Sequence, residues 1–329
     1  MTLWERLAGL PLVIDGYSLP MLTAFERTTT VVTLAGGGVV GEGEEVGLEP
    51  TLPADLELAG AWTLGGLCTR IAALDLFPEG PPEWEIARGF RRWAFESATL
   101  DLALRQAGMS LASVLGREAR PVRFVNSLGL GSPASADVIA RRFAAYPSVE
   151  FKLDAAVDWS DEVIAALASL GCVAIVDFKG RYGLPVEDPD ALAAMYARVL
   201  PAFAAPVLFE DPHEGFAPPA ERVSFDAPIL RAADIGATRT INVKPSRIGS
   251  LEALLEVYEW CAAHGVAMYG GGMGELGPGR RQIQLLAALF HPDGPNDVAP
   301  SAFNAPEPPA GLPASPLVVD ADAPGFGAT

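Results

Sequence analysis

The chain has 329 residues, half of them apolar, so it is long enough to bury a large core and to form a barrel domain with a smaller module. Its formal net charge of −18 with only 23 lysines and arginines argues against nucleic acid or an anionic membrane as a partner, because both require clustered basic residues. No apolar run approaches the roughly 20 residues that cross a bilayer. Glu5 and Arg6 also interrupt the apolar start that a signal peptide needs, so we expect a cytoplasmic protein.

The cysteines and histidines do not form a metal-binding pattern. The three cysteines are widely spaced within apolar segments, which favours reduced core residues over a disulfide or a zinc cluster. The three histidines also lack the spacing of metal ligands. These residues are Cys68, Cys172 and Cys261, and His213, His264 and His291.

The first third of the chain predicts a small α+β module. Residues 28–47 (TTTVVTLAGGGVVGEGEEVG) contain two β-rich runs around a Gly-Gly-Gly turn, which is typical of an antiparallel hairpin. Residues 81–116 are helical in pattern, and Gly108 is expected to end the main helix. The tail after Phe303 is rich in proline until residues 316–322 (PLVVDAD), which we expect to return and pair with the opening sheet.

After Pro121 short apolar runs alternate with helical segments, which indicates βαβ units and a parallel sheet. Eight candidate strands with intervening helices suggest a closed barrel. A doubly wound open sheet is the alternative, but the chain lacks the Gly-rich nucleotide fingerprint after its first strand, so the barrel is favoured. The candidate strands are residues 122–127, 149–154, 173–179, 205–211, 222–227, 239–244, 266–271 and a weak one at 297–303.

Acids and lysines collect at the carboxyl ends of these strands. The chain contains only three lysines among its 23 basic residues, and all three lie at strand ends. In a barrel those ends form the active-site face. Because strand side chains alternate, residues two apart share a face, and three such pairs would point into the barrel mouth. The pairs are Lys152 with Asp154, Asp177 with Lys179, and Asn242 with Lys244.

Three acids on successive strands predict a metal site. Asp177, Glu210 and Asp226 each follow an apolar run and would present oxygen atoms to one point. Such ligands suit a hard divalent cation, and we predict one Mg²⁺ ion per subunit. The alternative is that the acids and lysines form structural ion pairs that cap the barrel.

Several motifs resemble the enolase superfamily, on its muconate lactonising and mandelate racemase side, and especially o-succinylbenzoate synthase or dipeptide epimerase. The resemblance covers nearly the whole chain, and NVKPSRIGS and GGGMGELG are its most specific parts. It implies an α/β fold with a modified TIM-type (β/α) barrel over residues 118–304. An α+β capping domain would comprise residues 1–117 and be completed by the tail, about 305–329. The other motifs are IDGYSLP, VVGEGEEV, ESATLDLALRQAGMSLASVLG, FKLD, VDFK and FEDP.

The resemblance also implies a magnesium-dependent isomerase or lyase that removes the proton beside a substrate carboxylate. One Mg²⁺ ion would be held by Asp177, Glu210 and Asp226. The ion and nearby cations would bind the substrate carboxylate and stabilise the dianionic enolate, so that a weak carbon acid becomes accessible to a side-chain base. Lys244 matches the lysine of the sixth strand, which serves as a base or as an electrostatic stabiliser.

The sequence departs from the family pattern on two strands. Where the second strand usually carries Lys-x-Lys, this chain has Lys152 and Asp154, and where the third usually carries Asp-x-Asn, it has Asp177 and Lys179. Either Lys179 or Asp154 serves as a second catalytic acid or base, or the two pair across adjacent strands and leave Lys244 as the only general base. The second arrangement fits a one-base elimination or cycloisomerisation.

Substrate-binding residues are expected in two places. In the resembled family, capping-domain loops set specificity, and here residues 17–21 and 62–67 are apolar, which suggests a hydrophobic distal group on the substrate. The alternative is that they only pack the domain interface. The glycines after the seventh strand either let the backbone approach the substrate or serve a tight strand exit. The candidates are Tyr17, Leu19, Trp62, Asn242, Gly271, Gly272, Met273 and Glu275.

Two other functions stay open at this point. A buried barrel lysine could form an imine with a carbonyl substrate, as in a Schiff-base lyase. A barrel that has lost turnover could instead bind a metal ion or ligand and would exchange no substrate protons. The partner expected first is a small-molecule carboxylate, and the resemblance is compatible with a homo-oligomer.

Overall fold

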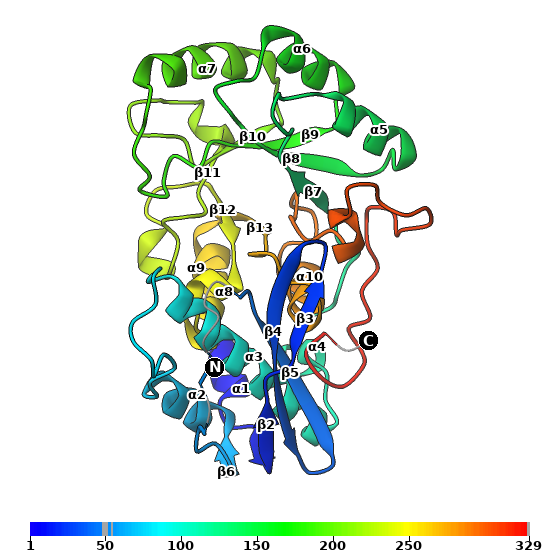
Figure 1. Cartoon of the computed structure of the whole chain (residues 1–329). Helices are drawn as coiled ribbons and strands as arrows, with labels where there is room; N and C mark the ends of the chain where they lie inside the picture. The colour runs from blue at the N-terminus through cyan, green and yellow to red at the C-terminus, as the bar shows by residue number, and fades with distance from the viewer. Residues whose placement is uncertain (48–51, 54, 328–329) are drawn as a thin grey trace.

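The computed structural model describes residues 1–47, 52–53 and 55–327, and its larger part is a ring of parallel strands with helices outside (Figure 1). Five strands pair in the order β7-β8-β9-β10-β11, and β12 pairs with β13. Their order in the chain is their order around the ring, as βαβ units require. The strands are β7 (Val125–Leu128), β8 (Glu150–Asp154), β9 (Val173–Asp177), β10 (Leu208–Glu210), β11 (Val223–Ser224), β12 (Thr240–Val243) and β13 (Ala267–Gly270).

Single backbone bridges complete the ring, so the predicted barrel is confirmed. Residues 296–297 fill the eighth position, whereas we predicted a strand at 297–303. That prediction is wrong because Pro300 has no N–H to donate and the next residues turn into η3 (Ser301–Asn304). The bridges are Phe225 to Ile241, Gly271 to Asp297, and Phe124 to Asn296.

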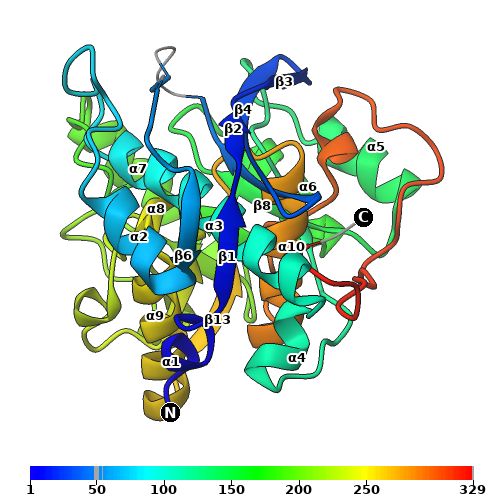
Figure 2. The ribbon, with the colours of Figure 1, turned by 90° about the horizontal axis from the view of Figure 1, so that it is seen from below.

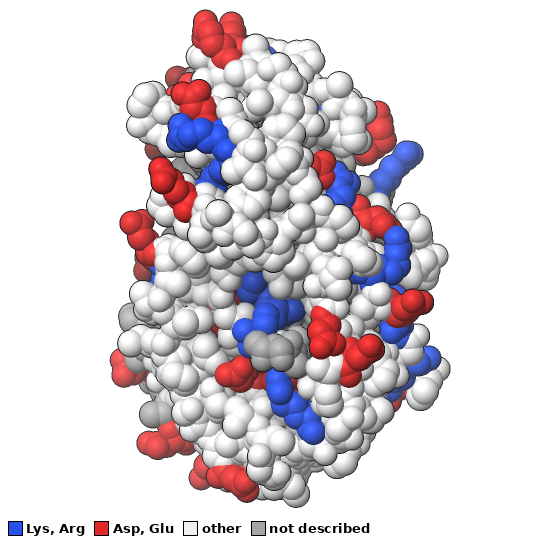
Figure 3. Space-filling view, turned by 90° about the vertical axis from the view of Figure 1, so that its right-hand side faces the viewer, with Lys and Arg blue, Asp and Glu red and all other residues white. Residues whose placement is uncertain are grey.

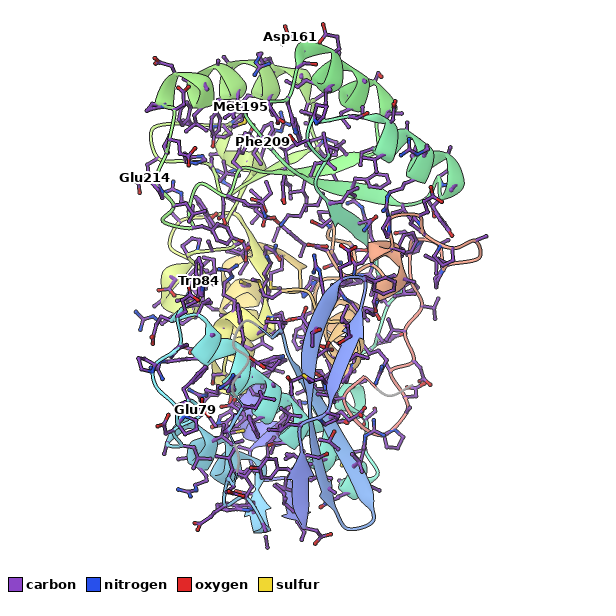
Figure 4. All side chains as sticks on the ribbon, viewed as in Figure 1. Glu79, Trp84, Asp161, Met195, Phe209 and Glu214 are labelled. Carbon is purple, nitrogen blue, oxygen red and sulfur yellow. The ribbon has the colours of Figure 1, made fainter. Side chains whose placement is uncertain are left out.

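Helices cover the outside of the ring. Ser160, Asp188 and Ser250 each accept an N–H group in the first turn of α6, α7 and α9, which explains where these helices begin. Met195 of α7 and Phe209 of β10 belong to one apolar cluster between helix and sheet (Figure 4). Around β11 only short turns are present, so the barrel is modified there. The elements are α5 (Asp137–Ala145), α6 (Asp161–Leu170), α7 (Pro189–Ala202), α8 (Pro245–Ile248), α9 (Leu251–His264), α10 (Pro278–Phe290), η1 (Ala220–Arg222) and η2 (Ala232–Asp234).

The N-terminal part is an α+β layer. Strand β4 pairs with β2 and β3 along one edge and with β5 along the other, and helix α3 packs along β5 and reaches α8. Gly108, with φ of 64°, ends α3 as predicted. Seen from below, β1, β6 and α2 lie side by side (Figure 2). The elements are α1 (Leu3–Leu7), β1 (Pro11–Ile14), β2 (Gly16–Ser18), β3 (Met21–Ala24), β4 (Arg27–Gly36), β5 (Val39–Glu45), β6 (Gly60–Thr63), α2 (Leu64–Ala72), α3 (Ala87–Ala107) and α4 (Leu111–Leu115).

The described residues of the C-terminal tail do not pair with the opening sheet. Leu317 exchanges backbone hydrogen bonds of 2.8 Å with Val122, just before β7, and Phe326 packs edge-on against Trp93 of α3. The predicted partner of residues 316–322 is therefore wrong, because the backbone of Val122 takes up the hydrogen bonds of Leu317. The domain boundaries stay a prediction, and the residues they enclose include 48–51, 54 and 328–329, which lie outside the described residues.

The cysteines are buried free thiols, as predicted. Among the described residues, no helix combines the length and the apolar character that a membrane span needs.

His291 joins the end of α10 to the closing segment of the barrel. Asn296 donates through Nδ2 to three backbone carbonyl oxygens, so its Oδ1 accepts from Gly270 N–H at 2.7 Å and faces His291 Nδ1 at 2.6 Å. Nδ1 therefore carries the ring proton, and Nε2 accepts from the Tyr258 hydroxyl at 3.4 Å. Burial lowers the pKa of His291 to about 4, so the folded protein holds this ring neutral.

We expect His291 to make the protein less stable as pH falls from 6.5 to about 4. The unfolded chain takes up a proton in this range that the folded protein does not, which costs about 3 kcal/mol of stability. The measurement is the melting temperature at pH 7 and pH 4.5 for the wild type and His291→Gln. The melting temperature should fall more for the wild type than for the variant between pH 7 and pH 4.5. An equal fall in both would contradict the role of His291.

Candidate active site

A cavity of about 330 Å³ opens at the carboxyl ends of the barrel strands, and Arg27 lines it from the start of β4 in the capping layer. All three lysines of the chain line it. On the face shown in Figure 3, Lys and Arg side chains gather in a hollow near the centre. The cavity lining carries more basic than acidic side chains, so it would concentrate a small anion although the whole chain carries a net charge of −18. The charged lining residues are Arg27, Lys152, Lys179, Lys244 and Arg280, with Asp154, Asp177 and Asp297.

Lys152 lies at the floor of this cavity between two carboxylates. Its Nζ is 3.1 Å from Asp177 Oδ2 and 2.5 Å from Glu210 Oε1, and only 2 % of the residue is exposed. The strand register explains the cluster, since Glu210 of β10 lies opposite Asp177 of β9. Burial opposes the charge of Lys152, but the two carboxylates outweigh burial and raise its pKa well above the usual range. Lys152 is therefore a buried ammonium ion.

Glu210 is surrounded by hydrogen-bond donors. Asn242 Nδ2 donates to its Oε1 at 3.2 Å, and the Tyr269 hydroxyl donates to its Oε2. Burial raises the pKa of Glu210 to about 8, with a further increase from the charges of Asp177 and Asp226 and opposition from Lys152. The acids are thus close enough to repel one another, and additional positive charge at this point would be stabilising.

Asp226 follows β11 and forms ion pairs with two basic side chains. Its Oδ2 lies 2.7 Å from Lys244 Nζ and accepts from the Tyr182 hydroxyl at 2.8 Å, while its Oδ1 lies 3.3 Å from Arg247 Nε. Burial opposes the negative charge, but Lys244 and Arg247 outweigh it and hold the pKa of Asp226 well below its usual range. Asp226 and Lys244 therefore form a buried ion pair, of which Lys244 lines the cavity.

The acids present a donor set that fits a divalent cation. Among the described residues, one oxygen each of Asp177, Glu210 and Asp211 lie within 4.8 Å of one another. Asp211, however, uses both oxygens to accept the N–H groups of Asp226 and Ala227 at 2.9 Å, so it holds the chain after β11. Asp226 Oδ1 accepts no hydrogen bond from any described residue. Carboxylates of this kind fit a hard cation, and Asp226 as the third ligand stays a prediction.

Asp154, at the end of β8, pairs with Lys179, which lies two residues after the end of β9. Lys179 Nζ lies 3.1 Å from Asp154 Oδ1 and 3.9 Å from Asp177 Oδ2, and about half of the Lys179 side chain is exposed. The backbone N–H of Lys179 donates to Asp177 Oδ1 at 2.9 Å, with a left-handed φ of 52°. The structure thus contains the ion pair that was one of the two interpretations of the altered motifs.

The two capping segments do not line the cavity. Tyr17 and Leu19 line a separate hollow, and Trp62 lies in β6 with its Nε1 donating to Leu58 O at 2.9 Å. Tyr17 also packs edge-on against Phe95 of α3. These side chains make their contacts within the capping layer, away from the cavity, so they give no support for a hydrophobic distal group on the substrate.

The loop after β13 contributes in a different way from that expected. Gly272 and Met273 line the cavity, whereas Glu275 is buried behind it. A Cβ atom at Gly271 would lie 3.1 Å from Lys244 Cε and 2.9 Å from Asn242 Oδ1. Glycine is therefore needed at position 271 to leave room for the lysine, and close approach to a substrate is not required to explain it.

Sequence reasoning missed several residues of the site. Arg247 and Asp211 lie inside the motifs NVKPSRIGS and FEDP, so the motifs held a signal for both. Tyr182 and Tyr269 reach the carboxylates from a loop and from β13, and no motif marked them. Arg27 makes no ion pair or side-chain hydrogen bond with another described residue, and only the folded hairpin brings it to the cavity.

The fold is shared with solved structures of known enzymes. Dipeptide epimerase from Methylococcus capsulatus, solved with a Mg ion, superposes with a TM-score of 0.71 at 17% identity, covering 96% of this chain and 99% of that one. Muconate cycloisomerase from Pseudomonas fluorescens gives a TM-score of 0.66 at 20% identity, covering 98% and 96%.

Curated relatives are similar to this chain in sequence. An o-succinylbenzoate synthase of Geobacillus stearothermophilus is 26% identical over 64% of this chain and 58% of its own length. An N-succinylamino acid racemase of Amycolatopsis sp is 30% identical over 63% and 60%. The alignments thus span about three-fifths of these relatives.

The chain is a member of the enolase superfamily, on the muconate lactonising side, as the motifs predicted. Two matching models divide it between them: an N-terminal domain over residues 5–114 and a C-terminal domain over residues 118–305. Both are described as domains of unknown function, and the chain belongs to that family, DUF8230.

Proposed function

We propose that the protein is an enzyme that removes the proton adjacent to a substrate carboxylate with the help of a divalent cation. The observation that carries this proposal is the cavity itself, in which Lys244 lies beside the buried acids at the barrel mouth. An amine at that position can take a proton from a carbon atom when the product anion is stabilised by nearby positive charge. Lys152 supplies one such charge.

Asp177, Glu210 and Asp226 would hold the cation, for which Mg²⁺ is our first choice because all three ligands are hard oxygens. When bound, it would supply Lewis-acid stabilisation of the substrate carboxylate. Around it, Lys152 compensates Asp177 and Glu210, and Arg247 holds Asp226 Oδ1 at 3.3 Å. Lys152 and Arg247 thus place positive charge beside the acids, although burial still raises the pKa of Glu210 to about 8.

The cavity supports an anionic substrate with more than one polar group. Its volume of about 330 Å³ suits a small molecule. Arg27, unpaired among the described residues, could bind a second carboxylate of the substrate, and Leu128 and Met273 provide apolar contacts. The relatives named for succinylated products support N-acyl amino acids and succinylated carboxylates as the first compounds to test. With Lys244 as the only base the reaction would be a cycloisomerisation or a syn-dehydration, and with a second base it would be an epimerisation.

We infer that Lys244 acts as the only base, because a cation held by Asp226 would take the place of the Lys244 ammonium group there, whereas Lys179 keeps its ion pair with Asp154. Lys179→Met should then keep turnover within about fivefold of the wild type, since the variant loses only a half-exposed ion pair. The measurement is the rate of α-proton exchange in deuterated water on any substrate found. A loss of a hundredfold would mean that Lys179 takes part in proton transfer and that the site has two bases.

Imine chemistry has less support: Lys152 is held between two buried carboxylates, and Lys244 becomes a free amine only when a cation takes its place at Asp226. A free amine is the nucleophile in Schiff-base formation. Borohydride trapping with carbonyl compounds is therefore expected to give no adduct.

The cation site is tested by calorimetric titration with Mg²⁺. We expect one site per chain in the wild type and none in Asp226→Ala, because the variant removes one of three ligands. Asp161→Ala, an exposed acid at the start of α6 (Figure 4), is the matched control and should bind as the wild type does. Mg²⁺ binding without exchange of any substrate proton would favour a barrel that has lost turnover and binds a metal ion. The absence of Mg²⁺ binding to the wild type would contradict the metal-assisted mechanism.

A further inference from the structure

Glu44, on β5 of the capping layer, is fully buried and binds the last loop of the barrel. Its Oε1 accepts from the Thr29 hydroxyl at 2.7 Å and from Leu276 N–H at 2.6 Å, and its Oε2 accepts from the N–H groups of Gly277 and Gly279 at 2.9 Å. Three of these four donors belong to the loop after β13 and to the first turn of α10. One carboxylate therefore ties the two parts of the chain together.

The geometry of this contact is demanding. Pro278 occupies the first turn of α10 and has no N–H, so Gly277 and Gly279 supply the donors that flank it. A Cβ atom at Gly279 would lie 2.9 Å from Glu44 Cβ and 2.9 Å from Glu275 Cγ. Glycine at position 279 is thus required by the close approach, and a negative charge at this end of a helix is favourable.

The same loop is held to the lysine segment from its other side. Glu275 accepts from Met273 N–H at 2.8 Å and from the Ser246 hydroxyl at 3.1 Å, and Ser246 lies two residues after Lys244. Between these two anchors, Gly272 and Met273 line the cavity. The position of this wall relative to Lys244 therefore depends on Glu275 and on Glu44.

We propose that Glu44 is a positioning residue, which holds the wall formed by residues 272–274 in place beside Lys244. It touches neither the proposed base nor the acids of the cation site. Its kinetic role rests on the proposed function, whereas its hold on the loop does not. Misplacement of a cavity wall by about 1 Å can reduce turnover about a hundredfold.

Hydrogen exchange tests the hold on the loop without any substrate. In Glu44→Gln the new amide group faces backbone donors, so peptides covering residues 271–280 should exchange at least tenfold faster than in the wild type. Peptides covering residues 150–177 should be unchanged. The matched control is Glu42→Gln on the same strand, whose ion pair with Arg281 at 3.6 Å lies outside the cavity. Unchanged exchange in residues 271–280, or equal acceleration throughout, would overturn the proposal.

Kinetics tests the positioning role on a substrate identified by proton exchange. In Glu44→Gln we expect kcat to fall at least tenfold, with KM within threefold and Mg²⁺ affinity within twofold of the wild type, and Glu44→Asp should recover part of kcat. If Glu44→Gln does not fold, Thr29→Val, which removes one of the four hydrogen bonds, takes its place. Equal loss of kcat and Mg²⁺ affinity would instead mean a general structural role. If the wild type exchanges no substrate proton, the proposed function fails. Amide hydrogen exchange in residues 271–280 then decides by itself whether Glu44 holds the loop.

Discussion

We expect Lys244→Met to reduce α-proton exchange by a hundredfold to ten-thousandfold, the usual contribution of a positioned general base. The methionine side chain has a similar length and fits the space between Gly271 and the cavity, so the fold should be kept. Mg²⁺ affinity should not fall, because Lys244 Nζ now lies 2.7 Å from Asp226 Oδ2 and competes with a cation for that oxygen.

The measurement combines deuterium exchange by mass spectrometry with calorimetric titration of the same variant. Lys179→Met, the same change at the other cavity wall, is the control and should keep most of the activity. Exchange in Lys244→Met within tenfold of the wild type would remove Lys244 from the mechanism. Loss of cation binding together with activity would show instead that the variant had disturbed Asp226.

Lys152→Met has the largest expected effect on stability. It leaves Asp177 and Glu210 buried without their shared ammonium ion, and removal of one partner from a buried ion pair costs about 3–5 kcal/mol. The melting temperature should therefore fall by several degrees in a buffer free of divalent cations. Added Mg²⁺ should raise it by more in the variant than in the wild type, because the cation then replaces the missing charge.

The control for this experiment is again a lysine with the same substitution but a different environment. Lys179 is about half exposed, so its ion pair with Asp154 is screened and Lys179→Met should change the melting temperature little. A variant of Lys152 that melts like the wild type would show that Asp177 and Glu210 relax by taking up a proton. Failure of Mg²⁺ to restore stability would argue against these acids as ligands.

The sequence predicts the barrel and its charged residues well because both depend on local patterns. Each lysine and acid follows an apolar run, and the two-residue alternation of β8 places Lys152 and Asp154 toward one cavity. The prediction of the eighth strand was wrong for an equally local reason, since Pro300 has no backbone N–H to donate to a neighbouring strand.

Contacts between distant segments were beyond the same reasoning. Nothing in the spacing of β5 indicates that Glu44 meets residues 276–279, and nothing in the apolar segment at Trp62 shows whether it faces substrate or core. The choice between pairing and catalysis for Lys179 also needed the distance to Asp154, which depends on the register of β8 and β9.

The scarcity of lysine has a practical consequence for chemical labelling. The chain carries three lysines; Lys152 and Lys244 are buried within ion pairs, while Lys179 is about half exposed at the rim of the cavity. An amine-acylating reagent would therefore meet mainly the N-terminus and Lys179. A probe attached to Lys179 would report from the active-site entrance, and a bound anion would slow the attachment, so occupancy of the site becomes readable before any substrate is known.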